Sequence, residues 1–341
     1  MLVIGGAGYI GNVLVRKLLG AGLRVRVLDR LLYEHGSSLA GVAEHPRFSF
    51  LRGDLCDPAQ LELALDEITD VVLLAALVGD PVSKRYPELT RAVNEEGAIG
   101  VFEALRGRGI DRFVFTSTCS NYGLRESEEP ATEDSELSPL SLYAETKVAF
   151  ERFVFDRASE ADFCPTVLRV ATAYGLSQRM RFDLTIAEFA RTMAIGEELV
   201  VYDADTWRPY CHVEDISQAI LTAMEAPADR VRGEVFNVGH SDENYTKRMV
   251  VEAAHQQLEG AGRVSFEEGG VDPRNYRVSF EKARRELGFE PRFRVPASIA
   301  ALVSAVRAGI FDDVEERPAY YASHTLPGVG ITVDAAGAGA D

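Results

Sequence analysis

Hydrophobic runs of four or five residues alternate with longer amphipathic stretches through the first half of the chain. Runs of this kind are typical of buried parallel strands, and the stretches between them have the spacing of helices that cover a sheet. Six strands in this alternation predict an α/β fold with a doubly wound parallel sheet. The expected strands are 1–4, 24–28, 48–52, 71–75, 112–116 and 164–169, and the expected helices are 10–20, 58–66, 90–108 and 142–158.

The alternation changes after residue 173, which predicts a smaller, discontinuous C-terminal domain. Later patterns indicate helices over 179–195, 213–225, 246–260, 280–287 and 296–308, with strands at 199–202 and 235–238, the second added to the main sheet. We therefore expect the first domain to comprise 1–173 plus about 213–238, and the second to comprise about 174–212 plus 239–327. The segment 328–341 is rich in Gly and Ala, has little to pack and is expected to be mobile.

Length and composition support two cores without a membrane segment. The 341 residues exceed the ~250 to 300 that one core usually serves. The longest apolar run, 71–78, is far shorter than the ~18 residues of a membrane span. Because Met1 leads directly into apolar residues and glycine, without the charged region of a secretory signal, we expect a cytoplasmic protein. The four cysteines, Cys56, Cys119, Cys164 and Cys211, form no CxxC pair, so reduced thiols are expected.

The formal net charge of −17 argues against nucleic acid as a partner. Binding to nucleic acid depends on clustered Lys and Arg that neutralise phosphates, and the field of this chain opposes it. The same field repels small anions, so a phosphate-bearing ligand needs a local group of arginines.

A glycine-rich loop, Gly5-Gly-Ala-Gly8-Tyr-Ile-Gly11, follows the first expected strand and opens the first expected helix. Glycines at this spacing allow a tight turn and a close approach of the backbone to a pyrophosphate at the positive end of the helix. Asp29 ends the second strand, where a carboxylate accepts hydrogen bonds from the adenosine ribose and repels a 2′-phosphate. The sequence thus predicts a Rossmann-type site for NAD.

Two further residues bear on this cofactor site. Arg30 follows Asp29, and an arginine there can accommodate the 2′-phosphate of NADP. Asp54 ends the third strand and is expected to reach the adenine amino group. Both aspartates are also common turn residues, which is the alternative interpretation.

Tyr143 and Lys147 lie four residues apart on an expected helix and therefore share one face. A nearby ammonium favours phenolate, so we expect Lys147 to pull the pKa of Tyr143 toward working pH. A tyrosine in that state can accept the proton of a substrate hydroxyl. Thr118, just past a buried strand, is placed to share that proton. The alternatives are a packed aromatic with a solvated lysine, and a threonine that caps a turn.

With these motifs the chain resembles the extended short-chain dehydrogenase/reductase family, in the branch of NAD-dependent nucleotide-sugar epimerases and dehydratases. The likeness runs from residue 1 to about 310. Its marks are the glycine loop, Asp54 in GDL, Ala75-Ala76, Asn94, Thr116 to Thr118 in FTSTCSNYG, Tyr143 with Lys147, Arg169 through Tyr174-Gly175, and Arg208 to Asp215.

The resemblance implies a fold, a cofactor and a set of roles. It implies homodimers formed through a four-helix bundle, here offered by 90–108 and 142–158, and Thr118 as a hydrogen-bond partner of the reacting hydroxyl. The cofactor-binding residues that it implies, beyond the glycines, Asp29, Arg30 and Asp54, are Tyr9, Ile10, Leu55, Ala75, Ala76, Asn94, Thr116, Tyr143 and Lys147.

The residues after Thr118 bear on the product. Oxidation of a sugar hydroxyl gives a ketone, and return of hydride to its opposite face gives an epimer. Family dehydratases usually carry Asp-Glu after the catalytic Thr, and decarboxylases typically place a glutamate at position 120, whereas this chain has Cys119-Ser120. We therefore expect a 4-epimerase, with a decarboxylase, dehydratase or ketoreductase, or a non-catalytic NAD sensor, as alternatives. Cys119 is either a small core residue or a thiolate that moves a carbon-bound proton.

Arginines gather in the expected second domain and suit the diphosphate of a nucleotide sugar, because a guanidinium offers a planar fork of donors. By resemblance Arg208 is the best phosphate ligand and Arg274 the second, with Arg181 also a candidate; Arg179 and Arg277 lie in the same region. Asp183 stands where many relatives have an asparagine, and its charge opposes phosphate. No metal site is expected, because His212 has no second ligand at suitable spacing.

Overall fold

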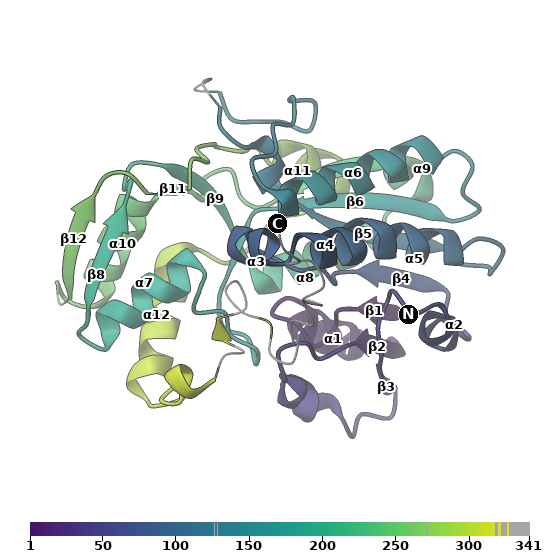
Figure 1. Cartoon of the computed structure of the whole chain (residues 1–341), viewed down its shortest axis with the longest axis horizontal. Coiled ribbons are helices and arrows are strands. Elements are labelled where there is room, and N and C mark those ends of the chain that lie inside the picture. The colour runs from purple at the N-terminus through teal and green to yellow at the C-terminus, as the bar shows by residue number, and fades with distance from the viewer. Residues whose placement is uncertain are drawn as a thin grey trace, which may run out of the picture.

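Seven parallel strands form the central sheet of the computed structural model, in the order β10-β6-β5-β4-β1-β2-β3 (Figure 1). The structure describes residues 1–125, 127, 129–260, 262–270, 272–317, 320, 321 and 326. The strands of this sheet are β1 (Leu2–Ile4), β2 (Val25–Asp29), β3 (Phe48–Arg52), β4 (Asp70–Leu73), β5 (Arg112–Thr118), β6 (Cys164–Val170) and β10 (Glu234–Val238).

Helices cover both faces of the sheet, because successive strand residues point to opposite sides and both sides are apolar. In β1, Val3 joins a core that includes α1 (Gly11–Gly20) and α8 (Val213–Glu225), while Leu2 and Ile4 join a core on the other face. That second core is closed by α2 (Pro58–Leu65), α5 (Ala98–Ala104) and α6 (Leu142–Arg157). The order of strands reverses beside β1, which is the switch point where ligands bind at the carboxyl ends of such sheets.

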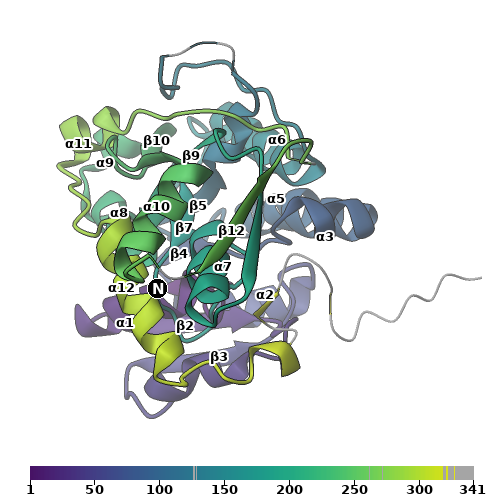
Figure 2. The same ribbon diagram turned by 90° about the vertical axis from the view of Figure 1, so that its left-hand side faces the viewer.

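A smaller second layer lies at the carboxyl end of the sheet (Figures 1 and 2). It contains a three-stranded sheet, β11-β9-β7, and a parallel pair, β12-β8, around a separate apolar core. Its strands are β7 (Thr172–Tyr174), β8 (Glu198–Tyr202), β9 (Trp207–His212), β11 (Asn244–Thr246) and β12 (Arg263–Glu267), and its helices are α7 (Thr185–Ala194), α10 (Lys247–Gln257) and α12 (Val295–Arg307).

The remaining short elements connect these layers. They are 3-10 turns at η1 (Gly36–Val42), η3 (Cys119–Tyr122) and η4 (Val314–Glu316), a π-helical segment η2 (Ala92–Gly97), and the helices α3 (Asp80–Arg85), α4 (Pro87–Arg91), α9 (Ala228–Val231) and α11 (Glu281–Leu287). Gly288 ends α11 in the left-handed conformation (φ 66°), which glycine adopts without strain.

The predicted fold class is confirmed, including the strand at 235–238, which pairs with β6 at the edge of the sheet. Two expected helices needed correction. The helix expected over 179–195 begins only at Thr185, because the residues before it form a loop that buries Arg179 and Arg181. The helix expected over 90–108 is divided into α4, η2 and α5 and ends at Ala104.

The proposed domain boundaries stay a prediction, although α8, α9 and β10 do pack against the main sheet. The segment 328–341 lies outside the described residues. Within the described ranges, no helix has the length and apolar character that a membrane crossing requires.

Candidate active site

The glycine-rich loop forms a cradle with no room for side chains. Gly5 has φ 88°, and a Cβ there would lie 2.6 Å from the backbone nitrogen of Ala75. A Cβ on Gly11 would overlap the carbonyl oxygen of Gly5. Helix α1 begins at Gly11, and among the described residues no side chain caps it. The free amides and the positive end of the helix dipole therefore fit a pyrophosphate, as NAD binding requires.

Asp29 is held beside this cradle by backbone amides. Its Oδ2 accepts a hydrogen bond from Ala7 N (3.0 Å), and its Oδ1 accepts one from Leu31 N (2.8 Å). Burial raises the pKa of the Asp29 carboxyl, while the two amide hydrogen bonds oppose that rise. A carboxylate fixed here retains lone pairs for ribose hydroxyls.

Arg30 and Asp54 form an ion pair with each other, with Arg30 Nη1 3.0 Å from Asp54 Oδ2. Asp54 also accepts a hydrogen bond from Cys56 N (2.9 Å). Because the charge of Arg30 is already offset, this arginine is poorly suited to a 2′-phosphate. The pairing supports NAD over NADP and occupies one oxygen of Asp54.

Several other predicted cofactor-site residues lie near the carboxyl ends of β1, β4 and β5. Asn94 clamps the loop after β4, because its Oδ1 accepts from Leu77 N (2.8 Å) and its Nδ2 donates to Leu77 O (3.0 Å). Thr116 donates its hydroxyl proton to Leu73 O (2.9 Å). The Ala75 amide is taken by Ile4 O.

Tyr9 and Ile10 connect the cradle to the second layer. The Tyr9 phenol donates to Gly175 O (2.7 Å), and its ring joins the core of the second layer. Ile10 packs against the cores of both layers. These contacts show how the two residues fix the start of α1, whereas their contact with a cofactor stays a prediction.

Tyr143, Thr118 and Lys147 come together at the end of β5, as the sequence predicts. The Thr118 side chain lies close enough to the Tyr143 phenol to lower its pKa. Ser141 caps α6 and thereby fixes the first turn, which carries Tyr143. Lys147 Nζ lies 5.9 Å from the centroid of the Tyr143 ring and donates to Thr116 O (2.9 Å).

The expected effect of Lys147 on Tyr143 is wrong in this structure. Burial raises the pKa of the Tyr143 phenol to about 12, and the neighbouring Thr118 side chain opposes the rise. Asp80 raises this pKa further, whereas Arg181 and Arg274 lower it. Burial also lowers the pKa of the Lys147 ammonium to about 7. The lysine is directed at a carbonyl, so desolvation decides both values.

Cys119 and Ser120 differ sharply in their surroundings. The Cys119 side chain is buried in the main core, donates to Arg169 O (3.2 Å), and has a thiol pKa raised by burial. This placement supports a structural role. The Ser120 hydroxyl accepts from Thr118 (3.0 Å) and from Arg274 Nη1 (3.3 Å), so it belongs to the site.

The predicted substrate arginines are each matched by a carboxylate. Asp272 binds both Arg208 (2.9 Å) and Arg274 (2.7 Å), which brings these two guanidinium groups together. Arg181 makes a two-point pair with Asp183, at 2.7 Å for each contact. Arg208 and Arg274 therefore meet near Ser120, while the charge of Arg181 is largely neutralised.

Two site carboxylates escaped the sequence analysis. The role of Asp272 can be predicted only with knowledge of the fold, because this residue precedes Arg274 by only two positions but follows Arg208 by 64. Asp80 lies 3.6 Å from Arg274, and its Oδ1 is buried without a hydrogen-bond partner among the described residues. Its signal was its place just after the fourth strand, where polar side chains gather at the ligand crevice. No cluster of three metal-ligating side chains occurs in the described part of the chain.

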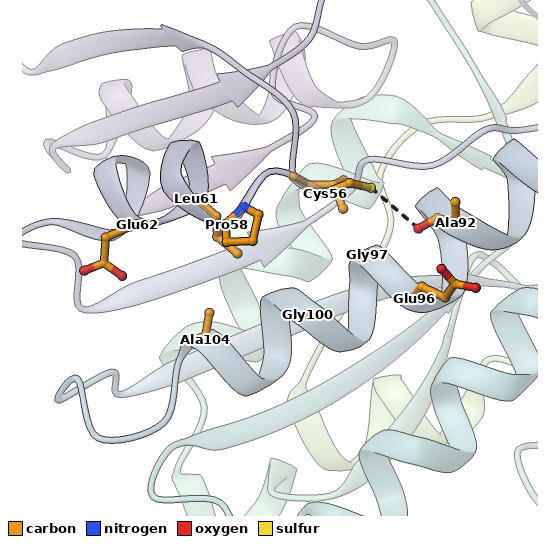
Figure 3. Close-up of a pocket in the computed structure, with 10 residues that line it drawn as sticks. Cys56, Pro58, Leu61, Glu62, Ala92, Glu96, Gly97, Gly100 and Ala104 are labelled. Atoms are coloured by element: carbon orange, nitrogen blue, oxygen red, sulfur yellow. Dashed lines mark hydrogen bonds between the residues drawn. The ribbon is translucent and has the colours of Figure 1, made fainter.

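A separate cavity of about 330 Å³ lies on the outer face between α2 and the η2–α5 helix (Figure 3). Two of its lining residues are in direct contact, because the Cys56 thiol donates a hydrogen bond to Ala92 O (3.5 Å). Of the predicted site residues, Leu55 borders this cavity. Its lining residues are Leu55, Cys56, Pro58, Leu61, Glu62, Ala92, Glu96, Gly97, Gly100 and Ala104.

The glycine cradle at the switch point, Asp29 beside it and the Thr118–Tyr143–Lys147 group define an NAD-binding enzyme of the extended short-chain dehydrogenase/reductase type. The chain belongs to the NAD dependent epimerase/dehydratase family, whose model matches residues 1–239. The predicted family, cofactor and enzyme class are thereby confirmed.

Similar proteins carry several related activities. The chain is 29% identical over 309 residues to a UDP-glucose 4-epimerase of Corynebacterium glutamicum, covering 85% of this chain and 90% of that protein. It is 31% identical over 315 residues to a dTDP-glucose 4,6-dehydratase of Streptomyces griseus, covering 89% and 93%. The crystal structure of Thermus thermophilus UDP-glucose 4-epimerase in complex with NAD superposes with a TM-score of 0.77 at 28% identity, covering 90% and 98%.

Proposed function

We propose that this protein is a nucleotide-sugar 4-epimerase that works through a transient 4-keto sugar. The observation that carries this proposal is the grouping of Tyr143, Thr118 and Lys147 at the carboxyl end of β5. Beside it, a buried Cys119 and a hydrogen-bonded Ser120 stand where family dehydratases carry an acid pair. The site thus has the groups for alcohol oxidation and lacks the usual groups for elimination at this position.

Tyr143 and Thr118 would handle the hydroxyl proton. Thr118 orients the sugar hydroxyl, and Tyr143 Oη accepts its proton while the carbon–hydrogen bond breaks. When bound, NAD supplies the hydride acceptor and, in its oxidised form, a positive charge. After the sugar turns its other face, Tyr143 returns the proton to the oxygen as the carbon is reduced. Both enzyme and cofactor end as they began, so no net redox change occurs.

Lys147 and the arginines would support this cycle from two sides. The Lys147 ammonium, held by Thr116 O at 2.9 Å, would contact the bound cofactor beside Tyr143. Arg208 and Arg274 converge on Asp272 and would bind the diphosphate of the substrate. The UDP- and dTDP-glucose enzymes among the relatives support a pyrimidine nucleotide of a hexose as substrate.

The second candidate is a nucleotide-sugar dehydratase, favoured by the similarity to the Streptomyces griseus protein. It uses the same first oxidation and needs an acid and a base for the neighbouring carbons. Asp80, with a buried and unpartnered Oδ1 near Arg274, is the carboxylate placed for that role.

We further propose a homodimer formed through the helices of 87–104 and α6, which lie side by side on one face (Figure 1). Arg91 and Glu145 link these helices at 3.8 Å. Light scattering on the purified protein tests this: a mass near 37.4 kDa would contradict the dimer, and twice that mass would support it.

Product masses test the function. Purified protein is incubated with UDP-, dTDP-, GDP- and CDP-hexoses, and products are separated and weighed. Unchanged mass with altered retention supports the epimerase, and loss of water indicates the dehydratase. Loss of carbon dioxide from a uronic acid indicates a decarboxylase, and gain of two hydrogens a reductase. No turnover with any sugar, combined with NAD binding, would contradict the proposal and favour a sensor.

A further inference from the structure

Arg179 is a buried cation whose donors are only partly used. Its side chain is 5% exposed, yet neither Nε nor Nη2 has a hydrogen-bond partner within the described ranges. A buried donor without a partner is costly, and a buried charge without one more so. Such a group in a ligand crevice indicates a missing anion.

The surroundings of Arg179 place it at the cofactor cradle. Its guanidinium carbon lies 4.7 Å from the centroid of the Tyr33 ring, four residues after Asp29. Its charge lowers the pKa of Asp29 and that of His35, which is itself 3.8 Å from Asp29. Arg179 therefore lies close to the end of β2.

The loop that carries Arg179 is tied to the start of α1. Ser177 Oγ accepts from Asn12 Nδ2 (2.8 Å) and from Arg179 N (3.3 Å), and donates to Tyr9 O (2.8 Å). Through Ser177, these three bonds tie the backbone of Arg179 to the first turn of α1. The loop that carries Arg179 and the N-terminus of α1 thus border the same cofactor cradle.

The neighbouring arginines already form ion pairs with carboxylates. Arg30 pairs with Asp54, and Arg181 pairs with Asp183. Arg179 has no carboxylate within ion-pair distance in the described part of the chain, and burial together with Arg181 lowers its pKa to about 10. The pyrophosphate of NAD brings negative charge next to the Asp29 carboxylate, so it needs a cation at this place.

We propose that Arg179 is a ligand of the NAD pyrophosphate, contributed by the second layer of the molecule rather than by the Gly-rich loop. A guanidinium donates two parallel hydrogen bonds to phosphate oxygens, and Nε with one terminal nitrogen is a suitable pair. Arg179, grouped with substrate arginines by the sequence analysis, thereby moves to the cofactor. It joins the two layers through the bound dinucleotide.

The test compares wild type, Arg179→Met and Arg179→Lys after removal of bound nucleotide. Calorimetry measures affinity for NAD, ADP-ribose, adenosine and UDP, and thermal unfolding measures stability without ligand. For Arg179→Met, loss of charged hydrogen bonds lowers affinity for NAD and ADP-ribose about 10- to 100-fold, with adenosine and UDP little changed. Arg179→Lys keeps the charge, so its affinity for NAD and ADP-ribose lies between those of wild type and Arg179→Met. Without ligand, the Met variant unfolds at the same temperature as wild type or higher, because an unpartnered buried cation is gone.

Arg181→Met is the matched control, since it removes a buried arginine of the same loop that already has a carboxylate partner. Its unfolding temperature falls because Asp183 is left unpaired. If Arg179→Met also lowers the ligand-free unfolding temperature and keeps wild-type NAD affinity, Arg179 is structural and the inference fails. A selective loss of UDP affinity would assign it to the substrate instead. The inference and the proposed function both depend on NAD binding. If the wild-type protein turns over a nucleotide sugar and Arg179→Met binds NAD with wild-type affinity, the inference alone is overturned.

Discussion

The guanidinium of Arg274 donates to the hydroxyl of Ser120 at 3.3 Å, so a proposed phosphate ligand is joined directly to the residue that accepts a hydrogen bond from Thr118. The proposed phosphate ligand and the proposed catalytic threonine therefore share one hydrogen-bond network. Arg274 is also held by Asp272 and lies near Asp80.

Replacing Arg274 by Met should weaken substrate binding. We expect KM for the nucleotide sugar to rise about 10- to 100-fold, because charged hydrogen bonds to phosphate are lost. A smaller fall in kcat should accompany it, since Ser120 loses its donor. Steady-state kinetics measure both, and NAD affinity should be unchanged. A normal KM would contradict the assigned role.

Replacing Tyr143 by Phe should abolish proton transfer while leaving the fold intact. The expected fall in kcat is about 10²- to 10⁴-fold, the usual contribution of a positioned acid or base. NAD titration and thermal unfolding serve as controls, because the Phe ring keeps the packing. Retention of full activity would exclude Tyr143 as the proton acceptor.

Removing the charge of Asp80 should move the pH profile. Asp80 raises the pKa of Tyr143, so Asp80→Asn lowers it, and the basic phenolate form is reached at lower pH. The rising limb of the kcat profile should shift down by roughly 0.5 pH unit, the size expected for one charge in a partly solvated site. An upward shift would show that Asp80 acts differently, for example by positioning Arg274.

Lys147 makes stability depend on pH. Burial lowers its pKa from 10.5 to about 7, so between these values the unfolded chain binds more protons and stability rises with pH. Lys147→Met removes this dependence. At pH 7 the free energy of unfolding in urea should be higher for Lys147→Met than for wild type. This difference should shrink by roughly 1 to 4 kcal/mol by pH 10. A difference that stays constant with pH would contradict the lowered pKa.

The buried pair of Arg169 and Glu151 should be important for folding. Their closest contact is 2.7 Å, and both side chains are nearly inaccessible. Glu151→Gln leaves a buried guanidinium without its counter-charge and should cost about 3 to 5 kcal/mol in urea unfolding. Glu62→Gln breaks an exposed pair with Arg108 and should change little. Equal effects of the two variants would show that burial does not decide the outcome.

Local patterns predicted the first layer well because each strand and helix there carries its own signal. The glycine loop, Asp29 and the spacing of Tyr143 and Lys147 all depend on short stretches of sequence. The 3.6-residue period places that pair on one helix face without any knowledge of the rest of the chain.

Contacts between distant segments were harder to predict. Strand β9 contains Pro209, which is unusual in a middle strand, and it pairs with β11 some 35 residues away. The pKa of Tyr143 depends on burial by the whole fold, which no local pattern contains. The pairing of Asp272 with Arg208 depends on the path of a long loop, and the unpartnered state of Arg179 is a property of its surroundings alone.

The π-helical turn at Ala92–Gly97 also has a mechanical consequence. Compared with an α-helix, one extra residue in this turn rotates everything that follows by roughly 100°. Asn94 sits within the turn and grips both backbone groups of Leu77. The two hydrogen bonds of Asn94 therefore tie the outer helix directly to the loop after β4 at the ligand crevice, so the position of this loop depends on the register that the π-helical turn sets.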